Sequence, residues 1–168
     1  MNLADYIRDI PDFPKPGIMF KDITTLLSSP EAFAASVDKL AELVKNADKI
    51  VGLDARGFIF ARAVSYKLGK PLILIRKKGK LPYKTIDISY DLEYGSDSFS
   101  MHTDSINSGE KIAIVDDLLA TGGTARAAID LIEQSGGIVD SLNFVIILDE
   151  LNGIAKLEGH KVNSLVSY

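Results

Sequence analysis

The chain contains no cysteine and only two histidines, His102 and His160, among its 168 residues. The absence of cysteine excludes disulfides and thiolate-bound metals, and two histidines this far apart in sequence do not predict a transition-metal site. No run of 18 apolar residues is present, and acids stand near the N-terminus where a secretory signal has a basic and then an apolar region. We therefore expect a cytoplasmic protein that does not bind a membrane.

An excess of positive charge is also missing, because the formal net charge is -4. Nucleic-acid-binding proteins rely on a broad basic face, so this composition argues against a nucleic-acid partner. It also predicts that any anionic ligand is held by a local cluster. The sequence has no internal repeat, low-complexity linker, GxGxxG or GxxxxGK[ST] motif. A chain of this length is typical of one domain, here 1–168, with a core large enough to need no covalent staples.

The most informative stretch of the sequence is IAIVDDLLATGGT, at positions 112–124. The apolar run Ile112–Val115 predicts a strand that ends at two adjacent carboxylates, Asp116 and Asp117. The glycines that follow open a predicted helix that reaches Ser135, and a second buried strand comes next. Two strands joined by one helix predict a parallel crossover, and therefore a parallel sheet covered by helices.

The spacing of apolar residues predicts most of the other elements. Serine before proline at 29–30 is typical of a helix start. In chain order we predict a short helix over Leu3–Ile10, a helix from Ser29 to Asn46, a strand over Lys49–Leu53, a helix ending near Gly69, a strand over Pro71–Ile75, a hairpin of Ile86–Tyr94 with Ser98–His102, and a strand over Phe144–Leu148.

The loop after Val115 has the composition of a phosphate site. Ligands of open α/β sheets bind where the strands end. Glycines at 122 and 123 let backbone N–H groups approach an anion, two threonines add hydroxyl donors, and the helix N-terminus adds its dipole. Acids beside a phosphate are useful only if they bind something else on the ligand, such as sugar hydroxyls or Mg²⁺. The alternative is a plain strand-to-helix turn in which Asp117 or Thr121 caps the helix.

The segment VDDLLATGGT resembles the ribose-phosphate binding motif of the type I phosphoribosyltransferases, in the version used by the adenine-specific branch of that family. The resemblance implies that Asp116 and Asp117 bind the ribose hydroxyls, directly or through a hydrated Mg²⁺ that is held mainly by the substrate. It also implies that the 5-phosphate is held by Ala120, Thr121, Gly122, Gly123 and Thr124.

Two further stretches resemble the pyrophosphate site of this family. GLDARGFIF matches a loop whose backbone faces the diphosphate, which implicates Ala55 and Arg56. LIRKKGKLPYK matches a basic stretch that holds pyrophosphate, partly across a dimer interface, which implicates Arg76, Lys77 and Lys80. From the residues alone, an ion pair or helix cap is the alternative for the first stretch, and a solvated basic face or an RNA patch for the second.

The stretch PDFPKPGIMFKDIT resembles the base pocket of the adenine-specific branch. Its prolines set a stiff loop that delivers Met19 and Phe20 to one place. The resemblance implies that Phe20 stacks on adenine, that the backbone at Met19 reads the edge of the base, and that Lys21 stands where the family usually has arginine, without its planar fork of donors. Leu151 matches the leucine on the opposite face of adenine. The alternative is an N-terminal arm with Phe20 in the core.

Apolar and polar residues alternate from Ile86 to Tyr94, which predicts a half-exposed antiparallel strand. SYDLEYG within this hairpin resembles the family's mobile loop. The match makes Glu93 the loop carboxylate, with a catalytic role as general base toward adenine and general acid in reverse. The alternative from the pattern alone is an exposed strand carboxylate.

The resemblance covers most of the chain and implies a parallel sheet flanked by helices, with a β-hairpin loop and a small hood formed by the N-terminal arm and the C-terminal tail. It implies transfer of the 5-phosphoribosyl group from phosphoribosyl pyrophosphate to adenine, giving AMP and pyrophosphate in purine salvage, with Mg²⁺ and in a homodimer. Two alternatives stay open: a non-catalytic regulator of the same fold that binds these ligands, and a sister transferase for guanine, hypoxanthine, xanthine or orotate.

Overall fold

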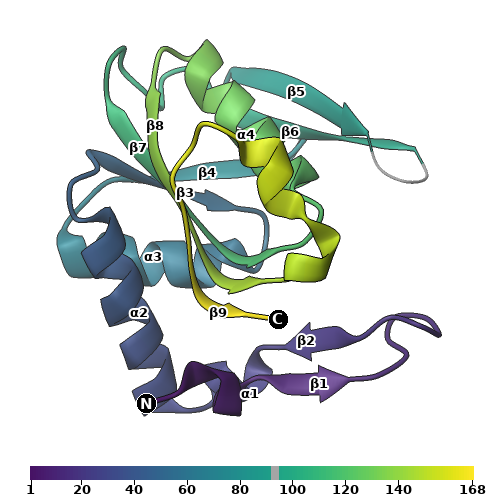
Figure 1. Cartoon of the computed structure of the whole chain (residues 1–168). Helices are drawn as coiled ribbons and strands as arrows, with labels where there is room; N and C mark the ends of the chain where they lie inside the picture. The colour runs from purple at the N-terminus through teal and green to yellow at the C-terminus, as the bar shows by residue number, and fades with distance from the viewer. Residues whose placement is uncertain (92–94) are drawn as a thin grey trace.

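The computed structural model of the chain describes residues 1–91 and 95–168. Its main sheet has the strand order β5-β6-β4-β3-β7-β8-β9 (Figure 1). The elements in chain order are η1 (Leu3–Tyr6), β1 (Arg8–Ile10), β2 (Phe20–Asp22), α1 (Thr24–Leu27), α2 (Pro30–Val44), β3 (Lys49–Leu53), α3 (Gly57–Leu68), β4 (Leu72–Lys77), β5 (Thr85–Asp91), β6 (Ser96–His102), β7 (Lys111–Leu119), α4 (Gly123–Gln134), β8 (Ile138–Ile147), η2 (Asp149–Leu151), η3 (Gly153–Leu157) and β9 (Val162–Ser167).

The centre of the sheet is parallel and its first edge is antiparallel. Strand β3 pairs in parallel with both β4 and β7, and β8 pairs in parallel with both β7 and β9. Strands β5 and β6 form an antiparallel hairpin that joins the sheet through β4. The predicted parallel crossover from β7 through α4 to β8 is therefore confirmed. Because β3 and β7 are neighbours and parallel, the loops that leave their carboxyl ends meet at one edge of the sheet.

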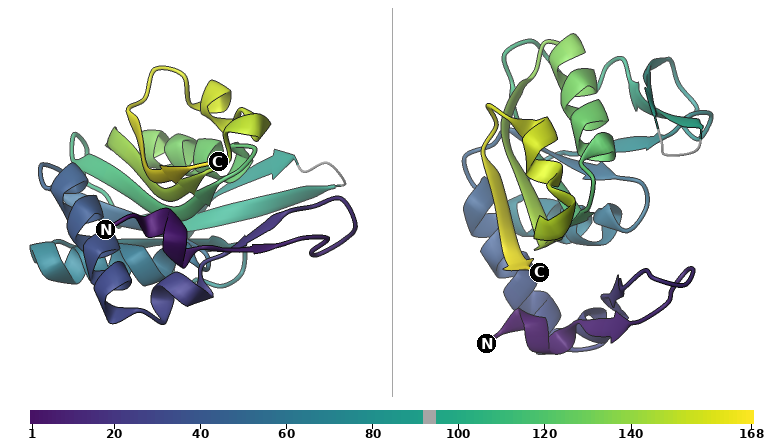
Figure 2. Two further views of the ribbon diagram at one scale, coloured as in Figure 1. Left: turned by 60° about the horizontal axis from the view of Figure 1, so that its bottom comes forward. Right: turned by 45° about the vertical axis from the view of Figure 1, so that its right-hand side comes forward.

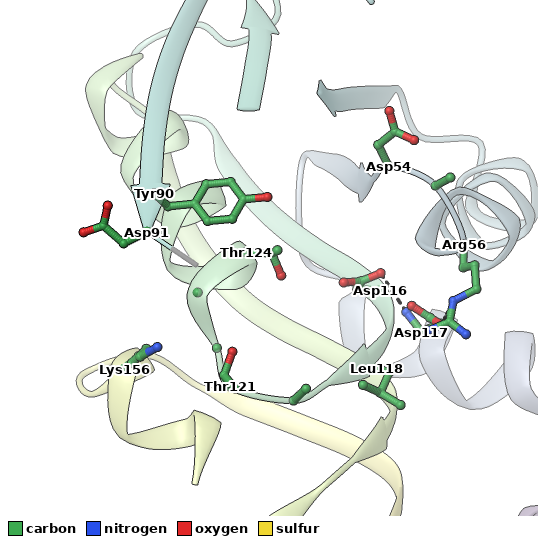
Figure 3. Close-up of a pocket in the computed structure, with 14 residues that line it drawn as sticks. Asp54, Arg56, Tyr90, Asp91, Asp116, Asp117, Leu118, Thr121, Thr124 and Lys156 are labelled. Carbon is green, nitrogen blue, oxygen red and sulfur yellow. Dashed lines mark hydrogen bonds and ion pairs between the residues drawn. The ribbon is translucent and has the colours of Figure 1, made fainter. Parts of the chain in front are cut away.

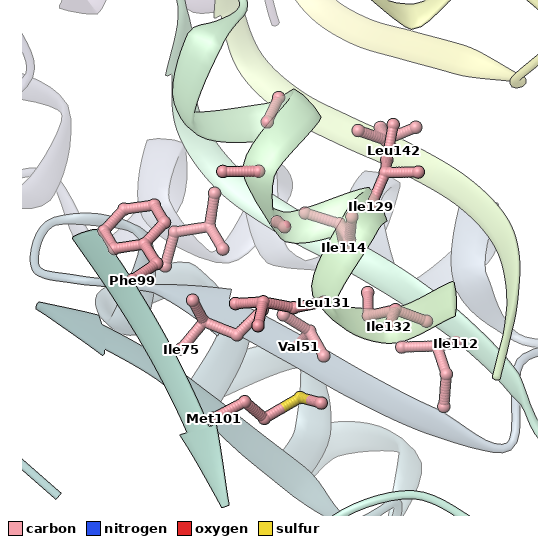
Figure 4. Packing of buried hydrophobic residues seen from close by; sticks show 14 of the residues in the cluster. Val51, Ile75, Phe99, Met101, Ile112, Ile114, Ile129, Leu131, Ile132 and Leu142 are labelled. Carbon is pink, nitrogen blue, oxygen red and sulfur yellow. The ribbon is translucent and has the colours of Figure 1, made fainter. Parts of the chain in front are cut away.

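Helices cover both faces of the sheet, as predicted. The core between α4 and one face includes Ile75, Ile114 and Leu131 (Figure 4). The core on the other face packs α2 and α3 against the sheet and includes Leu40 and Phe60. Strand β3 is buried along nearly its whole length, which explains its continuous apolar run. Within the described residues, each helix is too short or too polar to span a bilayer.

Helix α2 begins where the sequence predicts it. The Ser29 hydroxyl accepts a hydrogen bond from the Ala32 backbone N–H at 3.2 Å, and Pro30 occupies the first helical turn. The helix ends at Val44, two residues before the predicted end.

The N-terminal arm differs from the prediction. Instead of one helix over Leu3–Ile10, the chain forms η1 and then β1, which pairs with β2 to make a small hairpin outside the main sheet. The reason is a non-local contact, because the Arg8 guanidinium binds the Asp22 carboxylate at 2.6 Å across this hairpin. Figure 2 shows the β1–β2 hairpin and the β5–β6 hairpin projecting toward the same side of the molecule.

The bounds of β7 and β8 also differ from the prediction. Strand β7 continues through the two carboxylates to Leu119, because β8 pairs with it as far as the Leu119–Ile147 pair. Strand β8 itself begins at Ile138, six residues before the prediction. The predicted partner strands Ile86–Tyr94 and Ser98–His102 pair as β5 and β6, but the predicted end of the first strand, including Glu93, lies outside the described residues. The C-terminal tail, predicted as part of a hood, contributes β9 to the edge of the main sheet.

Candidate active site

A pocket of about 590 Å³ opens where the chain leaves the carboxyl ends of β3 and β7 (Figure 3). Four segments meet there: the loop after β3, the end of β7 with the loop into α4, the end of β5, and η3 from the tail. The lining residues are Asp54, Ala55, Arg56, Tyr90, Asp91, Asp116, Asp117, Leu118, Ala120, Thr121, Gly122, Gly123, Thr124 and Lys156.

Nine of the predicted site residues are among them. The structure brings together the whole predicted phosphate loop, both carboxylates after Val115, and the predicted pair Ala55 and Arg56. The two groups of residues are at least 60 positions apart in the sequence, so their meeting depends on the parallel pairing of β3 with β7.

The phosphate loop wraps the N-terminus of α4. Gly122 has a φ of +87°, a conformation that residues with a Cβ rarely adopt, and it places the following N–H groups at the helix start. A Cβ at Gly122 would also lie 2.5 Å from the backbone oxygen of Gly153. Glycine is therefore required here by conformation and by the close approach of η3.

The two carboxylates are buried at the base of the pocket. Asp116 and Asp117 are only 8% and 5% exposed, and the Asp117 backbone N–H donates to Oδ1 of Asp116 at 2.9 Å. Burial, together with the neighbouring charge of Asp117, raises the pKa of Asp116 well above its usual range. Gly57 makes room for this carboxylate, because a Cβ there would lie 2.3 Å from Oδ1 of Asp116.

Ion pairs link the loop after β3 to the ends of the neighbouring strands β7 and β4. Nε of Arg56 lies 2.8 Å from Oδ2 of Asp117, and Nε of Arg76 lies 3.2 Å from Oδ2 of Asp54. Although it lies near Arg56, the buried Oδ2 of Asp117 accepts no aligned hydrogen bond from the described residues. This buried carboxylate oxygen is therefore open to a water, an ion or a ligand group.

This carboxylate pair fits a magnesium ion bound together with a substrate. Mg²⁺ in such sites uses one or two carboxylates and completes its octahedron with water and phosphate oxygens. Asp116 and Asp117 supply the carboxylates, and Asp117 has the unsatisfied oxygen. Within the described residues there is no cluster of three acidic, histidine or cysteine ligands. The residues present therefore suit an ion held mainly by the ligand, not an all-protein cage.

The predicted basic residues Arg76 and Lys77, at the end of β4, and Lys80, in the following turn, are not among the lining residues of the pocket. Arg76 adjoins it through Asp54. Lys77 binds the Asp97 carboxylate, and this hydrogen bond raises the pKa of Lys77. Lys80 is exposed on the turn that follows. Arg76 and the backbone of Lys77, whose N–H donates to Oδ2 of Asp54 at 3.4 Å, are thus next to the pocket wall.

Among the predicted base-binding residues, Phe20 lies beside the lining residue Arg56. Its ring centroid is 5.4 Å from the guanidinium carbon of Arg56 and 5.1 Å from the ring centroid of Phe13, edge to face. Met19 and Leu151 are exposed. The Lys21 side chain does not face the pocket, because its ammonium binds the Asp9 carboxylate at 2.6 Å.

Sequence reasoning missed five lining residues as site residues: Asp54, Tyr90, Asp91, Leu118 and Lys156. Asp54 and Leu118 stand inside recognised motifs, so adjacency to those motifs was a usable signal. Tyr90 and Asp91 end a strand whose alternation predicted one buried and one exposed side chain. Lys156 lies in a tail without any motif, and no pattern in the sequence connects it to the pocket.

Comparison with known proteins identifies the family. The model of the phosphoribosyl transferase domain matches residues 22–165. Adenine phosphoribosyltransferase of Clostridium botulinum strain Loch Maree is 55% identical over all of this chain and 99% of its own.

Solved structures agree with this match. The crystal structure of adenine phosphoribosyltransferase from Thermoanaerobacter pseudethanolicus superposes with a TM-score of 0.94 at 46% identity, covering 99% of this chain and 98% of that one. The Saccharomyces cerevisiae enzyme, complexed with an imino-altritol bisphosphate and adenine, has a TM-score of 0.91 at 38% identity, covering 97% of this chain and 96% of that one. On its fold, its pocket and these similarities over its full length, the chain belongs to the adenine phosphoribosyltransferases of the phosphoribosyl transferase family.

Proposed function

We propose that the chain transfers the 5-phosphoribosyl group of phosphoribosyl pyrophosphate to adenine, which gives AMP and pyrophosphate in purine salvage. The observation that carries the proposal is one pocket holding a glycine-rich loop at a helix N-terminus, two buried carboxylates and an arginine loop. Phosphate, sugar hydroxyls and diphosphate are the groups these features bind. The bisphosphate and adenine bound to the yeast relative support the same pair of ligands.

In this proposal, three parts of the pocket each bind a different group of the substrate. We assign the 5-phosphate to the loop from Ala120 to Thr124, which offers backbone N–H groups and two hydroxyls. The ribose hydroxyls go to Asp116 and Asp117, which lie between that loop and the β3 loop (Figure 3). The diphosphate goes to Ala55 and Arg56, with Arg76, Lys77 and Lys80 as further cations. This order follows the chemical order of groups along the substrate.

The reaction requires the C1 carbon to bear positive charge as pyrophosphate leaves. The site must therefore neutralise the leaving group and keep water from the carbon. Arg56 can move from Asp117 to the diphosphate when the substrate hydroxyls take its place on that carboxylate. Bound Mg²⁺, with Asp116 and Asp117 as its protein ligands directly or through water, supplies further charge neutralisation at the leaving group.

Adenine recognition in this proposal combines stacking with backbone contacts. Phe20 supplies the ring on one face, and Leu151 supplies the apolar contact on the other. Backbone groups at Met19 and Lys21 read the exocyclic amino group, so 6-oxo purines are rejected because their donors and acceptors are mispaired. The side chain of Lys21 already has partners in Asp9 and Tyr168, which supports a backbone role at this position.

We further propose that the chain works as a homodimer in the cytoplasm, where Arg76 or a neighbouring cation reaches the partner's site. An apolar groove beside α3 supports self-association, because large exposed apolar patches mark interaction surfaces. Tyr66 is 89% exposed there. The groove is lined by Phe33, Ile59, Arg62, Ala63, Ser65, Tyr66 and Leu72.

One assay tests the proposed activity directly. Purified protein is mixed with Mg²⁺, phosphoribosyl pyrophosphate and, in separate reactions, adenine, guanine, hypoxanthine, xanthine or orotate. We expect AMP from adenine and little product from the others, and comparable rates with guanine or hypoxanthine would refute the adenine assignment. Absence of product from every base would point to a binding protein.

Replacing both Asp116 and Asp117 by asparagine should weaken phosphoribosyl pyrophosphate and AMP binding while the fold survives, and unchanged AMP affinity would refute their role.

A further inference from the structure

Lys156 is a cation of the C-terminal tail that lines the same pocket as the phosphate loop. Figure 3 shows it beside Thr121, at the end of the pocket opposite Asp54 and Arg56. Building on the proposed function, we propose that Lys156 is a further binding residue for the 5-phosphate of the substrate. The phosphate loop, residues 120–124, carries no lysine or arginine of its own. Lys156, from the tail of the same chain, would therefore supply a side-chain cation that the loop lacks.

The charges in the pocket support this role. Its lining contains four carboxylates, at Asp54, Asp91, Asp116 and Asp117, and two cations. One of these cations, Arg56, already pairs with Asp117. Within the part of the chain that the structure describes, Lys156 forms no ion pair. A phosphate that enters a lining of net negative charge needs a cation nearby, and Lys156 is placed to provide it at this end.

The tail holds Lys156 in a fixed relation to the phosphate loop. Gly153 packs backbone to backbone on that loop, since a Cβ at Gly153 would lie 2.3 Å from the Ala120 oxygen and 3.1 Å from the Gly122 nitrogen. Leu157, the residue after Lys156, is fully buried in the core under α4. Lys156 thus lies near two anchored residues, Gly153 and Leu157, while its own side chain is exposed and lines the pocket.

The expected size of the effect follows from its chemistry. A hydrogen bond to a charged group contributes roughly a tenfold to hundredfold change in affinity, and solvent exposure places Lys156 at the low end of that range. Because the charge of the 5-phosphate does not change in the reaction, we expect its contact with Lys156 to be equally strong in the ground and transition states. Loss of such a contact raises KM and leaves kcat unchanged.

The test compares Lys156→Gln, Lys156→Arg and the control Lys161→Gln, which removes the same charge from an exposed lysine of the same tail. For Lys156→Gln we expect KM for phosphoribosyl pyrophosphate and the inhibition constant of AMP to rise about tenfold. KM for adenine, the inhibition constant of pyrophosphate, and kcat should each change less than about twofold. Lys156→Arg should recover most of the loss, and Lys161→Gln should behave as the unaltered chain.

Three results would overturn the inference: unchanged AMP inhibition in Lys156→Gln, an equal or larger loss for pyrophosphate, or the same loss in Lys161→Gln. Calorimetric titration of ribose 5-phosphate into the unaltered chain and Lys156→Gln tests the same contact without catalysis. If the unaltered chain makes no AMP, the proposed function fails. The titration still decides the role of Lys156, because a tenfold weaker affinity supports it and equal affinities refute it.

Discussion

The ammonium of Lys21 lies 3.6 Å from the ring centroid of Tyr168, the last residue of the chain. The same ammonium binds the Asp9 carboxylate at 2.6 Å. One buried cation thereby connects both strands of the β1–β2 hairpin to the C-terminus. Since Phe20 precedes Lys21 in β2, this connection sets the position of the aromatic ring proposed to stack on adenine.

We predict that Lys21→Met raises KM for adenine several-fold and lowers the free energy of unfolding by about 1 to 2 kcal/mol. The loss combines a cation–π contact with an ion pair whose acid is half exposed. Steady-state kinetics and chemical denaturation measure the two effects. Lys21→Arg keeps the charge over the ring and should retain most of both. If Lys21→Met leaves KM for adenine unchanged, the connection does not position the base site.

The buried carboxylate of Asp116 lowers the stability of the folded chain, although we propose that it binds the substrate. Its pKa is raised in the folded chain, so the folded state holds this proton more tightly than the unfolded state does. The wild-type free energy of unfolding therefore falls as pH rises from about 4, the ordinary aspartate value, until the pH passes the raised pKa. Asp116→Asn removes the buried charge and keeps an oxygen for the Asp117 N–H.

We expect Asp116→Asn to be more stable than the unaltered chain by about 1 to 3 kcal/mol at pH 7.5 and by less at pH 4.5. Its affinity for phosphoribosyl pyrophosphate should fall. Urea denaturation at both pH values and steady-state kinetics measure these effects. Asp117→Asn is the matched control, because that carboxylate pairs with Arg56 and its loss should bring no gain in stability. Lower stability of Asp116→Asn at both pH values would contradict the argument.

The sequence was most informative where chemistry depends on adjacent residues. The phosphate loop, the two carboxylates and the loop at Ala55 and Arg56 each form a local pattern, and the parallel pairing of β3 with β7 brings the patterns together. The helix α2 was predictable for the same reason, since its cap and proline are neighbours in sequence.

Features that depend on distant contacts were not predictable in this way. Strand β1 forms because Arg8 meets Asp22 across the N-terminal hairpin. Strand β7 runs on through polar residues because β8 pairs with it there. Lys156 reaches the pocket because Gly153 packs on the phosphate loop. A pattern of polarity along one segment contains no information on these partners.

The proposed dimer predicts a specific response to charge on α3. Tyr66→Glu places a carboxylate on the apolar groove beside that helix, which should shift the chain toward monomer because desolvating an unpaired charge opposes association. Sedimentation velocity at assay concentration measures the shift. Ile138→Glu is the control, because Ile138 is exposed at the start of β8, outside this groove. A fully active monomer of the unaltered chain would contradict the dimer proposal.

The last prediction concerns Glu93, whose proposed role comes from the resemblance of SYDLEYG to the family's loop. Adenine attacks through a ring nitrogen, so a proton must leave the purine as the glycosidic bond forms. A carboxylate within hydrogen-bond reach can take that proton and return it in the reverse reaction, and general catalysis of this kind contributes about 10² to 10⁴ in rate. Glu93→Gln keeps the size of the side chain and removes the base. We therefore expect kcat to fall by about that factor, with a smaller change in KM for phosphoribosyl pyrophosphate.

A matched control for Glu93→Gln is Asp87→Asn on β5. The Thr85 and Ser100 hydroxyls both donate to Oδ1 of Asp87, and asparagine keeps that acceptor. Asp91 is a poorer control than the strand pattern suggests, because it lines the pocket. Stopped assays of AMP formation over pH 5 to 9 should show the same acidic limb in Asp87→Asn as in the unaltered chain, because the general base is still present, and should show no such limb in Glu93→Gln. If the Glu93 and Asp87 variants behave alike, Glu93 is a surface carboxylate, and the proton leaves through Tyr94 or water.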